Sequence, residues 1–167
     1  MEAKMTVTIV SSLMLMAGLF LMLWAGVALI QDNRFFSSAP KDVLAVIQPR
    51  KERFPGQYLL GWILGILSIV IMAGALVYAG WDGVRSGFTF RQFFTRFLIM
   101  LLALKAYDIL FFDWFLLCHS GFFPHYYPEV KGVVGPHQFG YNIRDHLVMI
   151  LLCPVISALL AWICCRF

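Results

Sequence analysis

Charged residues interrupt a long apolar stretch of the chain. Lys105, Asp108 and Asp113 lie within a run of aromatic and aliphatic residues that extends from about Gln92 to Cys118. An ionised side chain at the centre of a membrane helix costs at least about 2.5–3.5 kcal/mol, and such residues usually mark an ion pathway, a proton relay or a substrate site. The sequence therefore predicts that these three side chains face protein or water.

The spacing of these residues predicts a shared helix face. At about 100° per residue, Lys105 and Asp108 form an i,i+3 pair, and Asp113 lies on the flank of their face. His119 falls on the same face if the helix continues that far. With the three charged groups ionised, one carboxylate still needs a proton, a cation or a partner from another helix. Either the group is a structural ion pair, or Asp108 or Asp113 exchanges a proton or binds a cation, with Lys105 tuning its pKa.

All four histidines of the chain lie between residues 119 and 146, in a segment rich in proline and aromatic residues. Two neighbouring helices need only a short connection, and long ordered loops often carry function. Imidazole suits zinc, copper, iron or nickel, so a transition metal is one candidate cofactor, although the spacing matches no common zinc pattern. The candidate metal ligands are His119, His125, His137, His146 and Glu129, with Cys118 beside them.

The same loop could instead serve a membrane enzyme. Histidine changes charge near neutral pH, which suits His119 or His125 as a general base. Asp108 and Asp113 are the candidate catalytic carboxylates in that case. A haem held between two of the histidines is a further alternative. In the simplest interpretation, the histidines and tyrosines only satisfy the loop's backbone at the depth of the lipid head groups.

The composition identifies the class of protein that must position these groups. Of 167 residues, 61% are hydrophobic and 13% are charged, and the mean hydropathy is +0.81. Soluble domains contain about 45–50% apolar and about 25% charged residues, so a soluble domain and a disordered chain are both excluded. The net charge of +4 comes from scattered basic residues, which indicates contact with the lipid bilayer and argues against a nucleic-acid partner.

The apolar runs predict an all-α, polytopic membrane protein: a four-transmembrane-helix bundle in a single membrane domain, residues 1–167. A spanning helix needs about 20 predominantly apolar residues, and the first run is too long for a signal peptide. Trp81-Asp82-Gly83 is expected to turn the chain after the second span. The predicted spans are 5–30, 58–81, 92–118 and 147–165, and the long polar and aromatic loop covers 119–146.

The connection between the first two spans, residues 31–57, is also long for a loop between helices. Ala39-Pro40 is expected to open a short helix, since proline is tolerated in the first turn, and Pro49 is expected to end it. One apolar face predicts that this helix lies in the membrane interface. That face consists of Val43, Leu44 and Ile47.

Basic residues favour one orientation. The loops 31–57 and 119–146 carry seven lysines and arginines, and the side with the termini and the second loop carries five. The positive-inside rule therefore favours loops 31–57 and 119–146 in the cytoplasm.

Small residues along two spans predict close helix packing. Gly61, Gly65 and Ser68 lie along one stripe of the second span, and Gly18 and Ala25 are one heptad apart in the first. Such stripes let two backbones approach. The packing could occur within one chain or between subunits.

The chain contains no dinucleotide fingerprint, P-loop, zincin helix or nucleophile elbow that would identify an activity. The charged residues and the long loop are compatible with three classes of function. The leading prediction is a membrane-embedded enzyme or cofactor-binding protein, with its site where the third span meets the histidine-rich loop. The first alternative is a small proton- or cation-coupled transporter or channel that uses Lys105, Asp108 and Asp113, and it would be a homo-oligomer because four helices rarely enclose a pathway. The second alternative is a structural or assembly subunit of a membrane complex.

Overall fold

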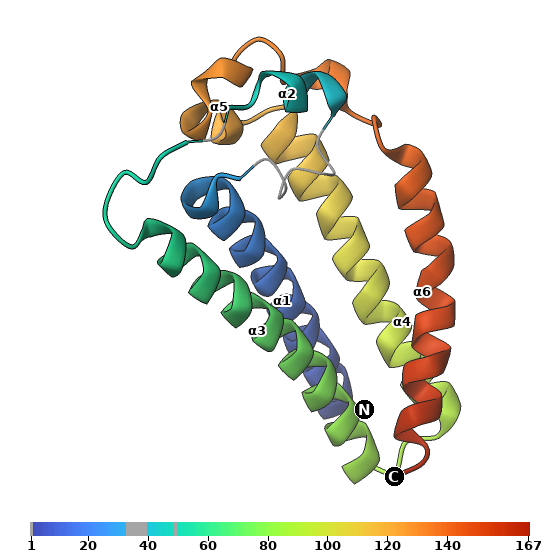
Figure 1. Ribbon diagram of the computed structural model, residues 1–167. Helices are drawn as coiled ribbons and strands as arrows, with labels where there is room; N and C mark the ends of the chain where they lie inside the picture. The colour runs from blue at the N-terminus through green and yellow to red at the C-terminus, as the bar shows by residue number, and fades with distance from the viewer. Residues whose placement is uncertain (1, 33–39, 49) are drawn as a thin grey trace. The chain divides into compact units, whose positions relative to one another are not determined.

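The computed structural model describes residues 2–32, 40–48 and 50–167, and in these ranges every regular element is helical, with no strand. Figure 1 shows the helices and their order along the chain. The elements are α1 (Glu2–Trp24), η1 (Ala25–Ile30), α2 (Lys41–Val46), α3 (Gln57–Arg85), α4 (Phe90–Tyr107), η3 (Asp108–Leu117), α5 (Phe122–Tyr126), η4 (Pro128–Val130), η5 (Pro136–Gln138) and α6 (Ile143–Cys164). Of these, η1 and η3 are π-helices, and η4 and η5 are single 3₁₀ turns.

Three helices of the described chain are long and apolar enough to cross a membrane, which is compatible with an integral membrane protein. They are Met5–Ile30, Gln57–Arg85 and Ile143–Cys164. The first coincides with the predicted span 5–30, because α1 continues into η1 without a charged residue. The second contains the predicted span 58–81. The third begins earlier than the predicted span 147–165.

The turn predicted at Trp81-Asp82-Gly83 is wrong. The helix α3 continues through this motif, and the chain turns at Gly87, where φ is +64° and the left-handed backbone favours glycine. Asp82 stays helical because its carboxylate accepts a hydrogen bond from Arg96 of α4 at 2.8 Å. A polar residue that looked like a turn signal is therefore a contact between two consecutive helices.

The predicted third span, 92–118, is helical but differs from the other three. It consists of α4 followed directly by η3, which together cover 18 and 10 residues. Three basic residues, Arg91, Arg96 and Lys105, make α4 less apolar than the three helices above. The segment is therefore not among the candidate spans that length and composition identify.

The short helix predicted after the first span is confirmed as α2, which follows Pro40. Val43 and Ile47 are buried in the structure, at 2% and 5% exposure, and Leu44 is partly buried beside them. This face therefore packs on protein. The predicted start at Ala39 and the predicted end at Pro49, like Arg34 of the orientation count, lie outside the described residues.

The predicted loop 119–146 is shorter than expected and partly helical. It contains α5, η4 and η5, and α6 begins at Ile143. His146 is therefore a buried residue of α6, at 7% exposure, and the prediction that it belongs to the loop is wrong.

The described chain divides into two compact units. Unit 1 contains Met1–Leu19, Ser68–Ala106 and Arg144–Phe167, and unit 2 contains Phe20–Leu67 and Tyr107–Ile143. Within unit 1, α3 and α6 run in the same direction and α4 runs in the opposite one (Figure 1).

The core of unit 1 is formed by aromatic residues of α4 and small residues of α3. Phe93 and Phe97 are each 1% exposed, and they pack with Ala75 and Ala79 of α3, which are fully buried. These small residues, which the predicted stripes did not include, let the helices approach. At Gly18 of α1, an added Cβ would lie only 2.6 Å from Met72 Cγ of α3, so a larger residue there would displace the Met72 side chain.

The core of unit 2 joins α2 to the segment after η3. Val43 packs with Tyr127 and Val130, which are both fully buried. The helix α3 also approaches η1 closely in this unit, because a Cβ on Gly61 would lie 2.7 Å from Ile30 Cγ1. At Gly65 an added Cβ would meet nothing within 4 Å. Close packing within one chain is therefore confirmed at Gly61, whereas Gly65 leaves room for a Cβ.

Candidate functional site

The carboxylates that the sequence singled out lie on η3, the π-helical continuation of α4. Asp108 is the first residue of η3 and is half-buried, and Asp113 is 8% exposed. Lys105 is half-buried in the last turn of α4. The two aspartates are the only charged residues among the ten of η3. No basic side chain of η3 itself can therefore neutralise them.

The π-helix changes which residues share a face. In a π-helix each N–H binds the carbonyl five residues earlier, so a turn holds more residues than in an α-helix. The expected angle between Lys105 and Asp113, which assumed 3.6 residues per turn, does not apply across η3. The condition for His119 to share their face is not met either, because η3 ends at Leu117. Segments of π-helix are rare and occur frequently at functional sites.

Two of the predicted histidines are exposed, and each packs on a neighbouring ring. His119 Nδ1 lies 2.7 Å from the carbonyl oxygen of Trp114, and the two ring centroids are 4.7 Å apart. The ring of His125 lies at 4.8 Å from that of Tyr126, in an edge-on arrangement. Tyr126 in turn accepts a hydrogen bond from Trp24 Nε1 at 3.1 Å. These contacts order the loop around the histidines.

The structure does not gather the predicted metal ligands. Within the part of the chain that it describes, no group of three or more His, Cys, Asp or Glu side chains could hold a metal ion. His119, His125 and His137 are all exposed, and each has different neighbours. His146 belongs to unit 1, whereas the other candidate ligands, including Glu129 and Cys118, belong to unit 2.

Glu129 forms an ion pair that joins two distant segments of unit 2. Its Oε2 lies 2.5 Å from Arg50 Nη2, and the backbone N–H of Gln48 donates to its Oε1 at 3.4 Å. Burial raises the pKa of the Glu129 carboxyl, but hydrogen bonds from its own backbone, from Gln48 and from Arg50 outweigh this effect and hold the pKa below its ordinary value. The carboxylate is therefore committed to this contact.

Two further contacts connect the same segments. The guanidinium of Arg50 lies over the ring of Tyr127, at 5.4 Å from the centroid. The side-chain amide of Gln138, itself buried, donates to Asp42 Oδ2 at 2.6 Å and to the carbonyl of Val133 at 3.2 Å, and lies 3.2 Å from His137 Nε2. We call the described residues of 40–57 and 119–142, which these contacts hold together, the cap.

Polar residues at the start of α3 cover the end of η1, which sequence reasoning missed. Gln57 is fully buried, and its amide donates to the carbonyl of Leu29 at 2.7 Å. Arg53 donates to the carbonyl of Ala28 at 2.5 Å. The last carbonyls of a helix have no partner within it, so these side chains supply one. Gln31, which follows η1, has a φ of +53°, an uncommon value for a residue other than glycine.

Arg96 of α4 makes a second set of polar contacts that sequence reasoning missed. Its side chain is 2% exposed and donates to the carbonyl of Ala79 at 2.7 Å and to Asp82 at 2.8 Å. Its guanidinium also lies 4.3 Å from the ring centroid of Phe88. The signal in the sequence was an arginine within an apolar run, which requires a partner in the same way as Lys105 does.

Comparison with known proteins yields no match for this chain among protein families, curated proteins or solved structures.

Proposed function

We propose that this is an integral membrane protein with four spans, in which α4 and η3 form the third span and Asp108 and Asp113 exchange protons or cations within the membrane. The observation that carries the proposal is the burial of Asp113, at 8% exposure, in a π-helical segment of a long apolar helix. Intramembrane carboxylates are costly and by default mark pathways or binding sites.

The cap supports the third span. The ion pair between Arg50 and Glu129 connects the segment before α3 with the segment after η3. Since α3 is long enough to cross a membrane, a chain that crosses there has to cross back before it reaches Glu129. Between them, α4 with η3 is the helical segment long enough for this, since its 18 and 10 residues together exceed the about 20 that a crossing needs, whereas α5 has only five residues.

The contacts of the loop residues favour a site at the two aspartates over an enzyme site built from the loop. An enzyme site was predicted to use His119, His125 and Glu129 together with the aspartates. The Glu129 carboxylate is held by Arg50 and Gln48, and the histidines have separate neighbours. In this proposal the cap has a structural role, which is to hold the ends of the spans together.

Proton exchange can be measured on purified protein in vesicles loaded with a pH-sensitive dye, with a potassium gradient and valinomycin as driving force. We expect the wild-type protein to acidify the vesicles, Asp113→Asn to fall to the level of protein-free vesicles, and Asp113→Glu to retain part of the flux. The matched control is Asp145→Asn, because Asp145 is exposed in the first turn of α6. The same vesicles loaded with a sodium-sensitive dye, with sodium added outside, test the cation.

Chemical labelling gives a second measurement that needs no transport. A hydrophobic carbodiimide reacts with protonated carboxyl groups in apolar surroundings, and mass spectrometry locates the adduct. We expect modification at Asp113 that a water-soluble carbodiimide does not give. Wild-type flux in Asp113→Asn, or the absence of both flux and labelling in folded wild-type protein, would overturn the proposal.

A further inference from the structure

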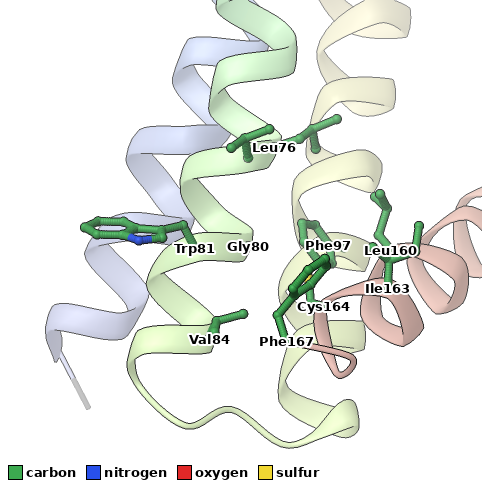
Figure 2. Close-up of a pocket in the computed structure, with 10 residues that line it drawn as sticks. Leu76, Gly80, Trp81, Val84, Phe97, Leu160, Ile163, Cys164 and Phe167 are labelled. Atoms are coloured by element: carbon green, nitrogen blue, oxygen red, sulfur yellow. The ribbon is translucent and has the colours of Figure 1, made fainter.

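Unit 1 contains an apolar groove that the proposed function does not use. Its volume is about 450 Å³, within the about 300–1,000 Å³ typical of ligand sites. Side chains of α3, α4 and α6 surround it (Figure 2). The lining includes Leu76, Gly80 and Val84 of α3, Phe97 of α4 and Leu160 of α6.

The groove has the depth of one leaflet. From Leu76 to the end of α3 at Arg85 the helix rises by nine residue steps, about 14 Å, and half of the hydrocarbon core of a bilayer is about 15 Å. Gly80 opens the groove, because an added Cβ there would lie 3.1 Å from Cys164 Sγ. The groove is therefore long enough to receive an acyl chain from the membrane surface.

A second hollow adjoins the groove at the turn between α3 and α4. Its volume is about 300 Å³, and Val84, Cys164 and Phe167 line both spaces. In contrast to the groove, it includes the polar turn residues Gly87 and Thr89. The two spaces together have an apolar interior and a polar mouth, which is the distribution of polarity in a lipid.

The mouth carries excess positive charge. Arg85 and Arg91 are exposed, and each is the sequence neighbour of a residue that lines one of the two hollows. Arg166 is also exposed, but its guanidinium lies over the ring of Trp162, which lines neither hollow, at 4.7 Å. Arg85 lies over the ring of Trp81, which lines the groove, at 5.3 Å. Among residues 81–97 and 160–167 the single acidic residue is Asp82, which is paired with Arg96.

We infer that this groove binds one anionic phospholipid, with an acyl chain between α3 and α6 and its phosphate at the arginines of the mouth. An acyl chain gains little by exchanging lipid for an apolar groove, because lipid tails are as apolar as leucine. Selectivity must therefore come from the head group, and basic residues at the membrane surface attract anionic lipids. The inference is independent of the carboxylates on η3.

Nitroxide-labelled lipids test the inference on the full chain, reconstituted in phosphatidylcholine vesicles. We expect labelled phosphatidylglycerol to be immobilised in several-fold excess over labelled phosphatidylcholine. In 1 M NaCl, where charges are screened beyond about 3 Å, the excess should fall to about one. The double variant Arg85→Gln/Arg91→Gln should lose the excess at low salt. The double variant Lys51→Gln/Lys131→Gln, at two exposed positions of the cap, is the charge-matched control and should keep it.

A second pair of variants tests the groove itself. Val77 lines the groove and is 70% exposed, so Val77→Trp should fill the space and abolish the excess. Val70 lies one heptad earlier on α3 and is 59% exposed, and Val70→Trp should behave as wild type. Equal immobilisation of the two lipids by the wild-type protein, or an unchanged excess in folded Val77→Trp, would overturn the inference.

Discussion

Gly83 is the residue at which α3 comes closest to the buried ring of Phe93. An added Cβ would lie 2.3 Å from Phe93 Cε1, and Phe93 is 1% exposed and held in the core. We expect Gly83→Ala to lower the free energy of unfolding by about 1–3 kcal/mol, the usual cost of overpacking. Thermal unfolding in detergent measures it.

The control for this prediction lies on the same helix. An added Cβ at Gly74 would meet nothing within 4 Å, so Gly74→Ala should leave stability unchanged or raise it slightly, since alanine favours helix. If both variants unfold at the same temperature as wild type, the contact at Gly83 is not as tight as the structure has it.

A sequence shows which residues are costly to bury, but it does not show which groups they will contact. The charges of Lys105, Asp108 and Asp113 were visible in the sequence because apolar neighbours make them unusual. The π-helix that carries the aspartates was not, because apolar periodicity alone does not distinguish i→i+5 from i→i+4 hydrogen bonding. Gly83 looked like a turn residue because it follows Asp82, although it lies within α3 and packs closely against Phe93 of α4.

Among the helices, the packing of α4 on α3 depends on Arg96. Its buried guanidinium holds the carbonyl of Ala79 and the carboxylate of Asp82. We expect Arg96→Ala to destabilise the protein by about 3–5 kcal/mol, because removal of one partner of a buried pair leaves the other uncompensated. Asp82→Asn should cost less, since its side chain is 26% exposed and the amide oxygen still accepts.

Exposed Arg91 of the same helix is the matched control, and Arg91→Ala should change stability by less than about 0.5 kcal/mol. Denaturant unfolding of the three variants, monitored by the circular dichroism of the helices, measures the loss of stability in each and so ranks them. A larger loss for Asp82→Asn than for Arg96→Ala would contradict the assignment of Arg96 as the buried member.

Long uncharged runs predicted three helices well, because a membrane helix needs little more than length and apolarity. The ends were harder. The second helix continued beyond its predicted end because Asp82 meets a partner on the next helix, 14 residues on. The helix α2 was predicted from Pro40 and its apolar face, but the burial of that face against Tyr127 could not be predicted, since it depends on a segment far along the chain.

The cap makes part of the molecule sensitive to acid. Because the folded-state pKa of Glu129 is lowered, its stabilisation is complete above the usual glutamate pKa of about 4.3 and is lost as the pH falls through the lower folded value. We expect the protection factors of amides in segments 41–48 and 122–134, which correct for the slower intrinsic exchange in acid, to fall below about pH 4. Glu129→Gln should exchange faster at neutral pH and lose much of this pH dependence. An identical acid response in the variant would contradict the role of the ion pair.

The ion pair between Arg50 and Glu129 joins residues 79 apart, and no local pattern announces such a contact. Their types suggested a basic anchor and a metal ligand, and both are instead committed to docking one segment of the cap on the other. This contact also carries the argument for the number of crossings.

That number can be tested with single cysteines. Ser86, Lys51 and Lys131 are exposed, in the turn after α3 and in the two segments of the cap. In a background with the four native cysteines replaced by serine, a membrane-impermeant maleimide should label Lys51→Cys and Lys131→Cys from the same side of intact cells, and Ser86→Cys from the other side only. If α4 and η3 did not cross, Ser86→Cys and Lys131→Cys would be labelled together. That result would separate the segments that Arg50 and Glu129 join, and the cap could not form in the membrane.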